Sequence, residues 1–118
     1  MNIEACFYEI PVADRTRAAK FYAEIFGVKL EWQENGGYYM AFFPKMSGAL
    51  VQGEGYMAGS NGCVFYLTCG DDLQLVLDKV EAAGGKVIYP KMKISDEYGY
   101  SSHIIDSEGN KLGLWSRN

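Results

Sequence analysis

The 118-residue chain has few of the residues that build common metal and nucleophile sites. It contains one histidine, His103, and three cysteines, Cys6, Cys63 and Cys69, with no CxxC pair. An odd number of cysteines without paired spacing argues against a disulfide framework and against a cysteine zinc site, so we expect buried free thiols. No HExxH, GxSxG or glycine-rich phosphate-loop motif occurs. The enzyme classes that those motifs define are therefore excluded.

Long apolar runs and clusters of positive charge are missing as well. No apolar stretch approaches the length of a membrane-spanning helix, and the N-terminal sequence MNIEACFYEI lacks the basic region of a signal peptide. We therefore expect a cytoplasmic protein with no membrane partner. The formal net charge is −4 and Lys and Arg form no stripe, so nucleic acid is not expected as a partner either.

The chain does contain an ordered series of strand and helix signals in its first half. Residues 3–12 are typical of a strand, and Asp14 is a suitable helix N-cap. Apolar residues at helical spacing follow as far as Gly27, a residue typical of helix ends. Three further strands are expected before a linker rich in glycine, at residues 28–33, 38–43 and 49–52.

The second half repeats this order. The residues at which the two helices are expected to stop, Gly27 and Gly84, lie 57 positions apart (84 − 27). The second helix is expected to begin after Asp71 or Asp72. The strands of this half are expected at residues 63–69, 86–89, 100–105 and 111–115.

The repeat predicts an α+β fold built from two βαβββ modules. Module 1 covers about residues 1–53, a linker covers 54–62, and module 2 covers about 63–118, all within a single domain. Because one helix covers one face of each sheet, the other face stays open unless a partner covers it. We therefore expect a curved mixed sheet around a concave cavity, with the helices on the outer face. Small ligands commonly bind in such a cavity.

Two segments resemble signatures of a known superfamily. EIPVADRTRAAKFYAEIFG (Glu9–Gly27) is similar to the first strand and helix of glyoxalase-like proteins, and DSEGNKLGLW (Asp106–Trp115) is similar to their closing turn and strand. By this resemblance, which spans essentially the whole chain, the protein is identified as a member of the vicinal-oxygen-chelate superfamily of glyoxalases, bleomycin-resistance proteins and extradiol dioxygenases. It most resembles the subgroup related to lactoylglutathione lyase. The resemblance implies a homodimer, and it implies a divalent metal that acts as a Lewis acid.

The metal-ligand positions that the resemblance implies carry no donor side chains in this sequence. At the Val51 position, a register shift of one residue adds only a single amide oxygen, that of Gln52, which makes no metal site. We therefore predict no resident cofactor, and a divalent metal recruited elsewhere is disfavoured. The four positions are Phe7, Val64, Gly113 and Val51, with Leu50 and Gln52 as register alternatives to Val51.

Two ionisable residues remain as candidate catalytic groups. Side chains alternate along a strand, so Glu9 faces the cavity if Phe7 does, whereas Tyr8 and Ile10 face the helix. Glu9 could act as a general acid or base or hold an amine, or it could pair with Lys or Arg at a module or dimer junction. His103 could move a proton, or it could be an ordinary half-buried strand residue.

The remaining cavity-facing positions are rich in aromatic residues. The chain has nine Tyr and six Phe, and such rings can either stack on a planar ligand or pack in the core. The residues that we expect to bind a ligand are Phe7, Tyr39, Gln52, Val64, Tyr66, Thr68, Tyr100 and Trp115.

Three function classes fit these observations. The first is a protein that binds a small organic molecule in its concave cavity without a metal. The second is a lyase or isomerase of the lactoylglutathione-lyase-related class, either metal-dependent or based on Glu9. The third is a dimeric module with no chemistry of its own. The loss of all four ligand positions favours the first class, and the sequence does not identify the ligand.

Overall fold

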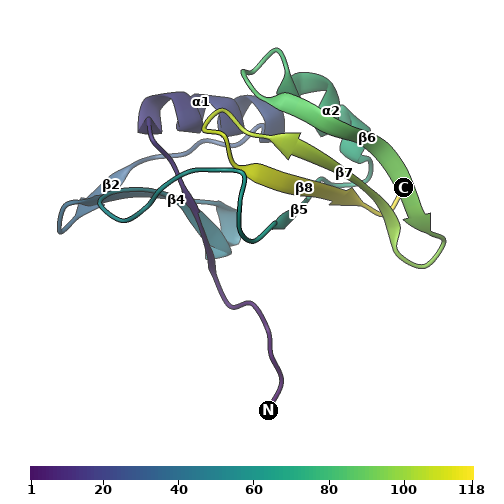
Figure 1. The fold of residues 1–118 in the computed structure, drawn as a ribbon, viewed down its shortest axis with the longest axis horizontal. Helices are drawn as coiled ribbons and strands as arrows, with labels where there is room; N and C mark the ends of the chain where they lie inside the picture. Colours follow the sequence, from purple (N-terminus) through teal and green to yellow (C-terminus); the bar gives the residue numbers. More distant parts are fainter.

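The computed structural model describes residues 1–118 and consists of two βαβββ modules, as the repeat predicts (Figure 1). In module 1 the elements are β1 (Tyr8–Pro11), α1 (Arg15–Phe26), β2 (Gln33–Asn35), β3 (Tyr38–Phe42), a short 3-10 turn (Pro44–Met46) and β4 (Gly48–Gln52). In module 2 they are β5 (Tyr66–Thr68), α2 (Leu73–Val80), β6 (Lys86–Ser95), β7 (Gly99–Ile105) and β8 (Lys111–Ser116).

Each module contains one four-stranded mixed sheet. The strand orders are β1-β4-β3-β2 and β5-β8-β7-β6, with β1 parallel to β4 and β5 parallel to β8. The edge strands β1 and β5 do not pair with each other, but side chains bridge them: the ring of Tyr8 on β1 lies 5.4 Å from the ring of Phe65, the residue just before β5. We call this boundary between the two sheets the module seam.

The two helices begin in the same way. Asp14 accepts a hydrogen bond from the backbone N–H of Arg17, and Asp72 accepts one from that of Gln74. The last residue of each module's parallel inner strand adds a second cap, because Gln52 accepts from the N–H of Arg15 and Ser116 from that of Leu73, both at 2.8 Å. These caps satisfy donors that a helix start leaves without intrahelical partners.

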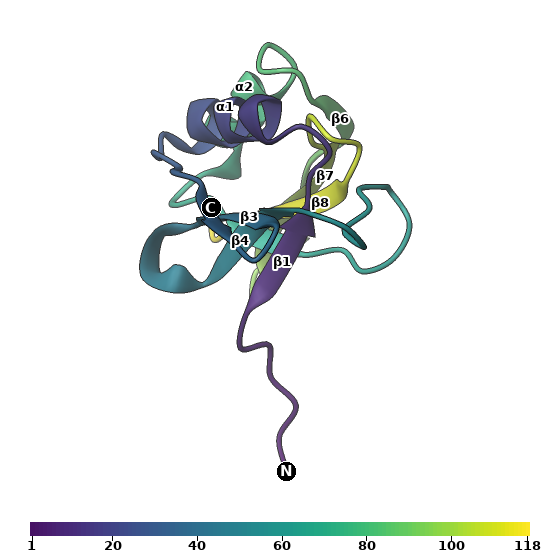
Figure 2. The same ribbon diagram turned by 90° about the vertical axis from the view of Figure 1, so that its left-hand side faces the viewer.

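Both helices lie on the same side of the molecule and share one core (Figure 2). Phe21 and Ile25 of α1 and Leu73 and Val80 of α2 are essentially inaccessible and belong to a single apolar cluster that spans both modules. Ile10 of β1 belongs to this cluster too, as strand alternation predicts. Neither helix is long and apolar enough to cross a membrane.

The sheet surfaces turned away from the helices form what we call the open face. It includes large apolar side chains that no other part of the chain covers, with Tyr66 and Tyr89 each 53% exposed and Met92 56% exposed. The N-terminal segment that precedes β1 extends on this side (Figure 1). The open face is therefore a candidate interaction surface.

Several element boundaries differ from those predicted. Strand β1 begins at Tyr8 and not at residue 3, because its partner β4 begins at Gly48, opposite Tyr8. Residues 28–32 are not in a strand, and β2 starts only at Gln33. Helix α2 ends at Val80, before Gly84, and β6 continues to Ser95 instead of ending at 89.

The prediction of buried thiols is correct for one cysteine only. Cys69 is buried at the end of β5, whereas Cys6 and Cys63 are exposed. Cys6 lies before the start of β1 and Cys63 before the start of β5, so neither belongs to the sheets that the helices cover. No disulfide forms among the three.

Candidate functional site

Two rows of side chains cross the open face of module 2. Strand pairing places Tyr66, Gly113, His103 and Tyr89 side by side on β5, β8, β7 and β6. The neighbouring row, two residues further along β8, contains Thr68, Trp115, Ser101 and Met92. Residues two apart on a strand share a face, so both rows face the same side.

In the first row, Gly113 has no side chain, and this leaves space for a neighbouring ring. The ring of Tyr66 lies directly on this glycine, with a ring carbon 2.3 Å from the place where a Cβ would stand. Gly113 is one of the four positions at which the resemblance implies a metal ligand. In this chain a phenol ring occupies the space that a ligating side chain would need.

Tyr66 and His103 form a hydrogen-bonded pair. The Tyr66 hydroxyl lies 2.7 Å from Nε2 of His103, and the ring of Tyr89 packs on the other side of the imidazole at 5.6 Å. Burial, and secondarily the charge of Lys111, hold the pKa of His103 below its usual value, so the imidazole is neutral near pH 7. Its Nδ1 is buried without a partner. A neutral imidazole that carries its proton on Nδ1 can accept a hydrogen bond from the Tyr66 hydroxyl at Nε2.

Glu9 lies on the open face of module 1, where its partner is a tyrosine. The hydroxyl of Tyr56 donates to Oε1 of Glu9 at 2.8 Å, and this bond is the largest of the causes that raise the pKa of Tyr56. The ring of Tyr56 also meets that of Tyr38 edge-on, with centroids 5.7 Å apart. Glu9 makes no ion pair with Lys or Arg within the chain.

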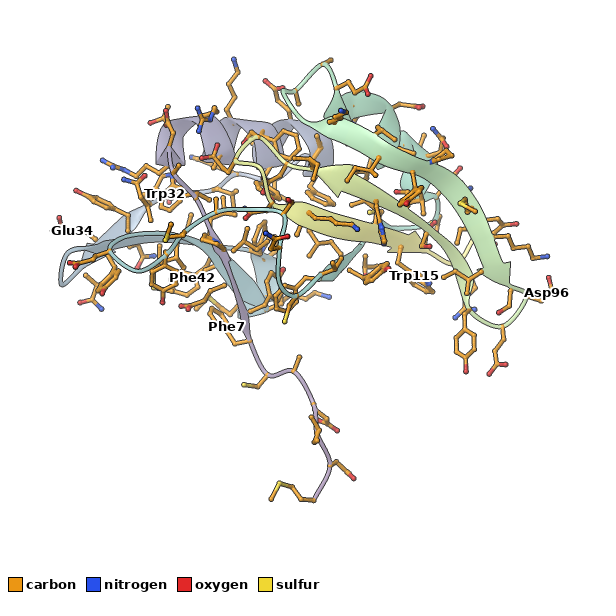
Figure 3. All side chains as sticks on the ribbon, viewed as in Figure 1. Phe7, Trp32, Glu34, Phe42, Asp96 and Trp115 are labelled. Carbon is orange, nitrogen blue, oxygen red and sulfur yellow. The ribbon has the colours of Figure 1, made fainter.

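The four positions that the resemblance assigns to metal ligands do not form a metal centre. Phe7 is 37% exposed and packs against Phe42 with centroids 6.2 Å apart, and both rings are visible below the sheet in Figure 3. Val51 is 1% exposed on β4. No three His, Cys, Asp or Glu side chains lie close enough to hold a metal ion together. The residues present therefore do not fit the divalent metal of the superfamily.

The predicted ligand-binding residues fall on both sides of the sheets. On or next to the open face lie Phe7, Tyr66, Thr68 and Trp115, and Val64 is half-buried just before β5. The Trp115 indole N–H donates to the carbonyl of Tyr98 at 2.6 Å, which fixes the ring orientation (Figure 3).

Tyr39, Gln52 and Tyr100 lie on the helix side instead. Register pairs Tyr39 with Gln52 and leaves Met40 and Val51 on the open face. The guanidinium of Arg15 lies 3.8 Å above the Tyr39 ring. Tyr100 packs against the core and lies beneath the ammonium group of Lys91 at 4.7 Å.

Sequence reasoning missed three contributors to the open face. Tyr56 belongs to the linker between the modules, for which strand alternation gives no orientation. Tyr89 and Met92 lie on β6, where register shifts around Pro90 change the alternation, so that residues three apart face the same side. The exposed apolar character of β6 could have indicated a surface role, but not which residues adjoin His103.

Comparison with known proteins identifies the class. The family model of the Glyoxalase/Bleomycin resistance protein/Dioxygenase superfamily matches residues 6–114. The chain belongs to this superfamily. A glyoxylase-like domain-containing protein from Didymella fabae is 28% identical over 116 residues, covering 92% of this chain and 90% of that protein.

Solved structures show the same fold. A glyoxalase/bleomycin resistance protein from Albidiferax ferrireducens matches with a TM-score of 0.67 and 18% identity, over 95% of this chain and 97% of that one. A glyoxalase I mutant from Zea mays matches with a TM-score of 0.74 and 20% identity. The chain covers 95% of its own length there but 45% of the maize chain. At these identities the likeness establishes the fold and not the activity.

Proposed function

We propose that this protein binds a small planar organic molecule on its open face and that it does so without a resident metal. The observation that supports this proposal is the stacking of Tyr66 on Gly113. It replaces a metal-ligand position with an aromatic surface whose hydroxyl is already paired with His103. A planar molecule could stack on Trp115 and Tyr66 and exchange a hydrogen bond with the Tyr66–His103 pair.

We further propose that a second copy of the chain covers the open face and encloses the bound molecule between the two chains. Exposed Tyr66, Tyr89 and Met92 lie in neighbouring rows, and a contiguous apolar surface of this kind usually marks an interaction site. Light scattering should then give twice the 13.1 kDa chain mass. Met92→Lys should yield the monomer, whereas Leu75→Lys, at an exposed position of α2, should leave the dimer intact. A monomeric wild-type protein would remove this part of the proposal.

A comparison of two tyrosine variants tests the binding proposal. Tyr66→Phe removes a hydroxyl from the open face, and Tyr100→Phe removes one from the helix side. A panel of planar aromatic compounds would be screened by calorimetry against the wild-type protein. For any compound that binds, we expect Tyr66→Phe to weaken the affinity about tenfold, the size of one hydrogen bond. Tyr100→Phe should bind like the wild type. Equal affinities for all three proteins would contradict the proposal, as would a panel with no binder.

The Tyr66–His103 pair also supports a second candidate, metal-free acid–base catalysis of the lyase or isomerase type. The neutral imidazole of His103 could act as a general base on a bound carbonyl compound, and the Tyr66 phenol beside it could donate a proton to the carbonyl oxygen. Glu9, held by Tyr56, would be a second acid or base on the same face. Turnover of α-ketoaldehyde adducts that is lost in His103→Ala and in Glu9→Gln, and that survives chelation, would favour this candidate. Turnover that requires an added metal would exclude it.

A further inference from the structure

A separate pocket of about 590 Å³ lies at the module seam. Both modules contribute to it: Tyr8, Phe43 and Ser47 from module 1, and Leu67, Cys69 and Val76 from module 2. Most of these side chains belong to the core cluster or pack against it, so the pocket lies on the helix side of β5. The edge strand β5 lies between this pocket and the open face, and two of its open-face residues, Tyr66 and Thr68, also line the pocket. The pocket is distinct from the open face because most of its lining lies on the helix side.

Hydrogen bonds close one end of the seam, and the pocket lies at the other end. At the closed end, the turn before β8 reaches from module 2 to module 1. Glu108 accepts from the backbone N–H groups of Ala13 and Asp14 at 2.9 and 2.8 Å, and Asn110 donates to the carbonyl of Pro11 at 2.8 Å. This end leaves only a minor pocket of about 180 Å³.

The counterpart turn in module 1, which precedes β4, makes no such bridge. Its sequence, Phe43 to Ser47, contains no acid or amide, and none of its hydrogen bonds reaches module 2. Phe43 and Ser47 instead form one wall of the pocket. The turn before β8 thus closes one end of the seam, whereas the corresponding turn before β4 leaves the other end open.

The lining defines the chemistry of an occupant. No charged side chain lines the pocket, and burial raises the pKa of the Cys69 thiol to about 11, so that this group is neutral as well. An ion would lose its hydration there without gaining a partner. Hydrogen-bonding capacity is limited to a few groups, notably the hydroxyls of Tyr8 and Ser47, which lie 3.5 Å apart. The volume lies within the usual range for ligand pockets.

We propose that the seam pocket is a second binding site, which takes an uncharged, mainly apolar small molecule with one hydroxyl, amine or carbonyl group. Such a ligand contacts both modules and bridges the end of the seam that the chain itself leaves open. Because only the folded arrangement of the modules forms the pocket, binding stabilises the native state.

The test uses the uncharged fluorescent amine N-phenyl-1-naphthylamine and the full chain. We expect saturable binding at one site per chain, with a rise in the thermal unfolding midpoint. Ser47→Trp should weaken this binding at least tenfold, because the indole fills the mouth of the pocket. Ser60→Trp, at an exposed linker position, should bind like the wild type. Equal binding by Ser47→Trp and Ser60→Trp would overturn the proposal, as would the absence of saturable binding.

A second pair of variants approaches the pocket from α2. Val76 is 8% exposed and lines the pocket, whereas its neighbour Leu75 is 67% exposed. Val76→Phe should weaken dye binding, and Leu75→Phe should not; equal affinities would contradict the proposal. Trp115→Ala separates the two sites, since it alters the open face alone. Loss of dye binding in Trp115→Ala would assign the dye to the open face and reject the seam site.

Discussion

The carboxylate of Glu108 joins module 2 to the start of helix α1 through Arg17. Oε2 of Glu108 accepts from Nε of Arg17 at 2.7 Å, while Oε1 accepts from the N–H groups of Ala13 and Asp14 and from the guanidinium of Arg17. The Glu108 side chain is fully buried, although that of Arg17 is 53% exposed. One acidic side chain from the second module therefore caps the helix of the first.

Glu108→Gln should destabilise the protein. The amide keeps the shape of the side chain but loses the charge, and its NH2 group cannot accept from the N–H donors that the carboxylate satisfies. We expect the free energy of unfolding to fall by about 1–3 kcal/mol, the usual cost of disrupting a buried charged hydrogen bond. Urea denaturation of both proteins measures this free energy of unfolding. Glu24→Gln, at an exposed position of α1, serves as the matched control and should change little. Equal stabilities of the two variants would show that the contact contributes nothing.

The contribution of Glu108 should depend on pH. Burial by itself would raise the pKa of this carboxyl, but the hydrogen bonds from Arg17, Asp14, Ser107 and Ala13 outweigh it and hold the pKa below the ordinary value. A lowered folded-state pKa adds stability that is complete above the unfolded pKa of about 4.3 and is lost as the pH falls through the lower folded value. The stability difference between wild type and Glu108→Gln should therefore be full at pH 6 and shrink below about pH 4. A difference that stays constant to pH 3 would contradict this reading.

The His103 imidazole should titrate below its usual range. Burial is the larger cause of the lowered pKa, and the charge of Lys111 is the smaller. NMR of the His103 ring should give a pKa below 6.5, the ordinary histidine value. Lys111→Met should raise that pKa without restoring the ordinary value, whereas Lys29→Met, on the exposed segment after α1, should not change it. A His103 pKa above 6.5 in the wild type would refute the neutral Tyr66–His103 pair.

Gly113→Ala should displace the Tyr66 ring. A Cβ at this position would stand 2.3 Å from a ring carbon, far inside contact distance. We expect the variant to lose about 1–3 kcal/mol of stability, as overpacked sites do. In Tyr66→Ala the ring is gone, so adding Gly113→Ala there should cost much less. Strict additivity of the two substitutions in a double-mutant cycle would show that the ring does not rest on the glycine.

The module architecture was predictable because each module repeats local signals. The caps Asp14 and Asp72 and the stop at Gly27 are encoded within a few residues, and the structure forms all three. Strand ends were less predictable because they depend on distant partners: β1 begins where Gly48 can pair with Tyr8. The N-terminal residues have strand-like composition but no partner opposite them.

The candidate site was predictable only where alternation holds. Glu9, Tyr66 and Trp115 follow from the position of the helix side, and the structure places them on or next to the open face. The face on which Tyr39 and Tyr100 lie could not be predicted in this way, because it depends on how β3 pairs with β4 and β7 with β8 in the folded chain. The bond between Tyr66 and His103 joins residues 37 positions apart in strands that do not pair with each other. No local pattern in the sequence encodes it.

The two tryptophan indoles provide the most direct test of the open face as a small-molecule site. Trp115 lies in the proposed site and donates its N–H to Tyr98, whereas the Trp32 indole nitrogen is buried elsewhere without a partner. In ¹⁵N-labelled protein, each indole N–H gives its own NMR signal. Titration with a binder from the planar aromatic panel should shift the Trp115 signal and leave the Trp32 signal in place. A ligand that shifts Trp32 alone, or neither indole, would contradict the proposed site.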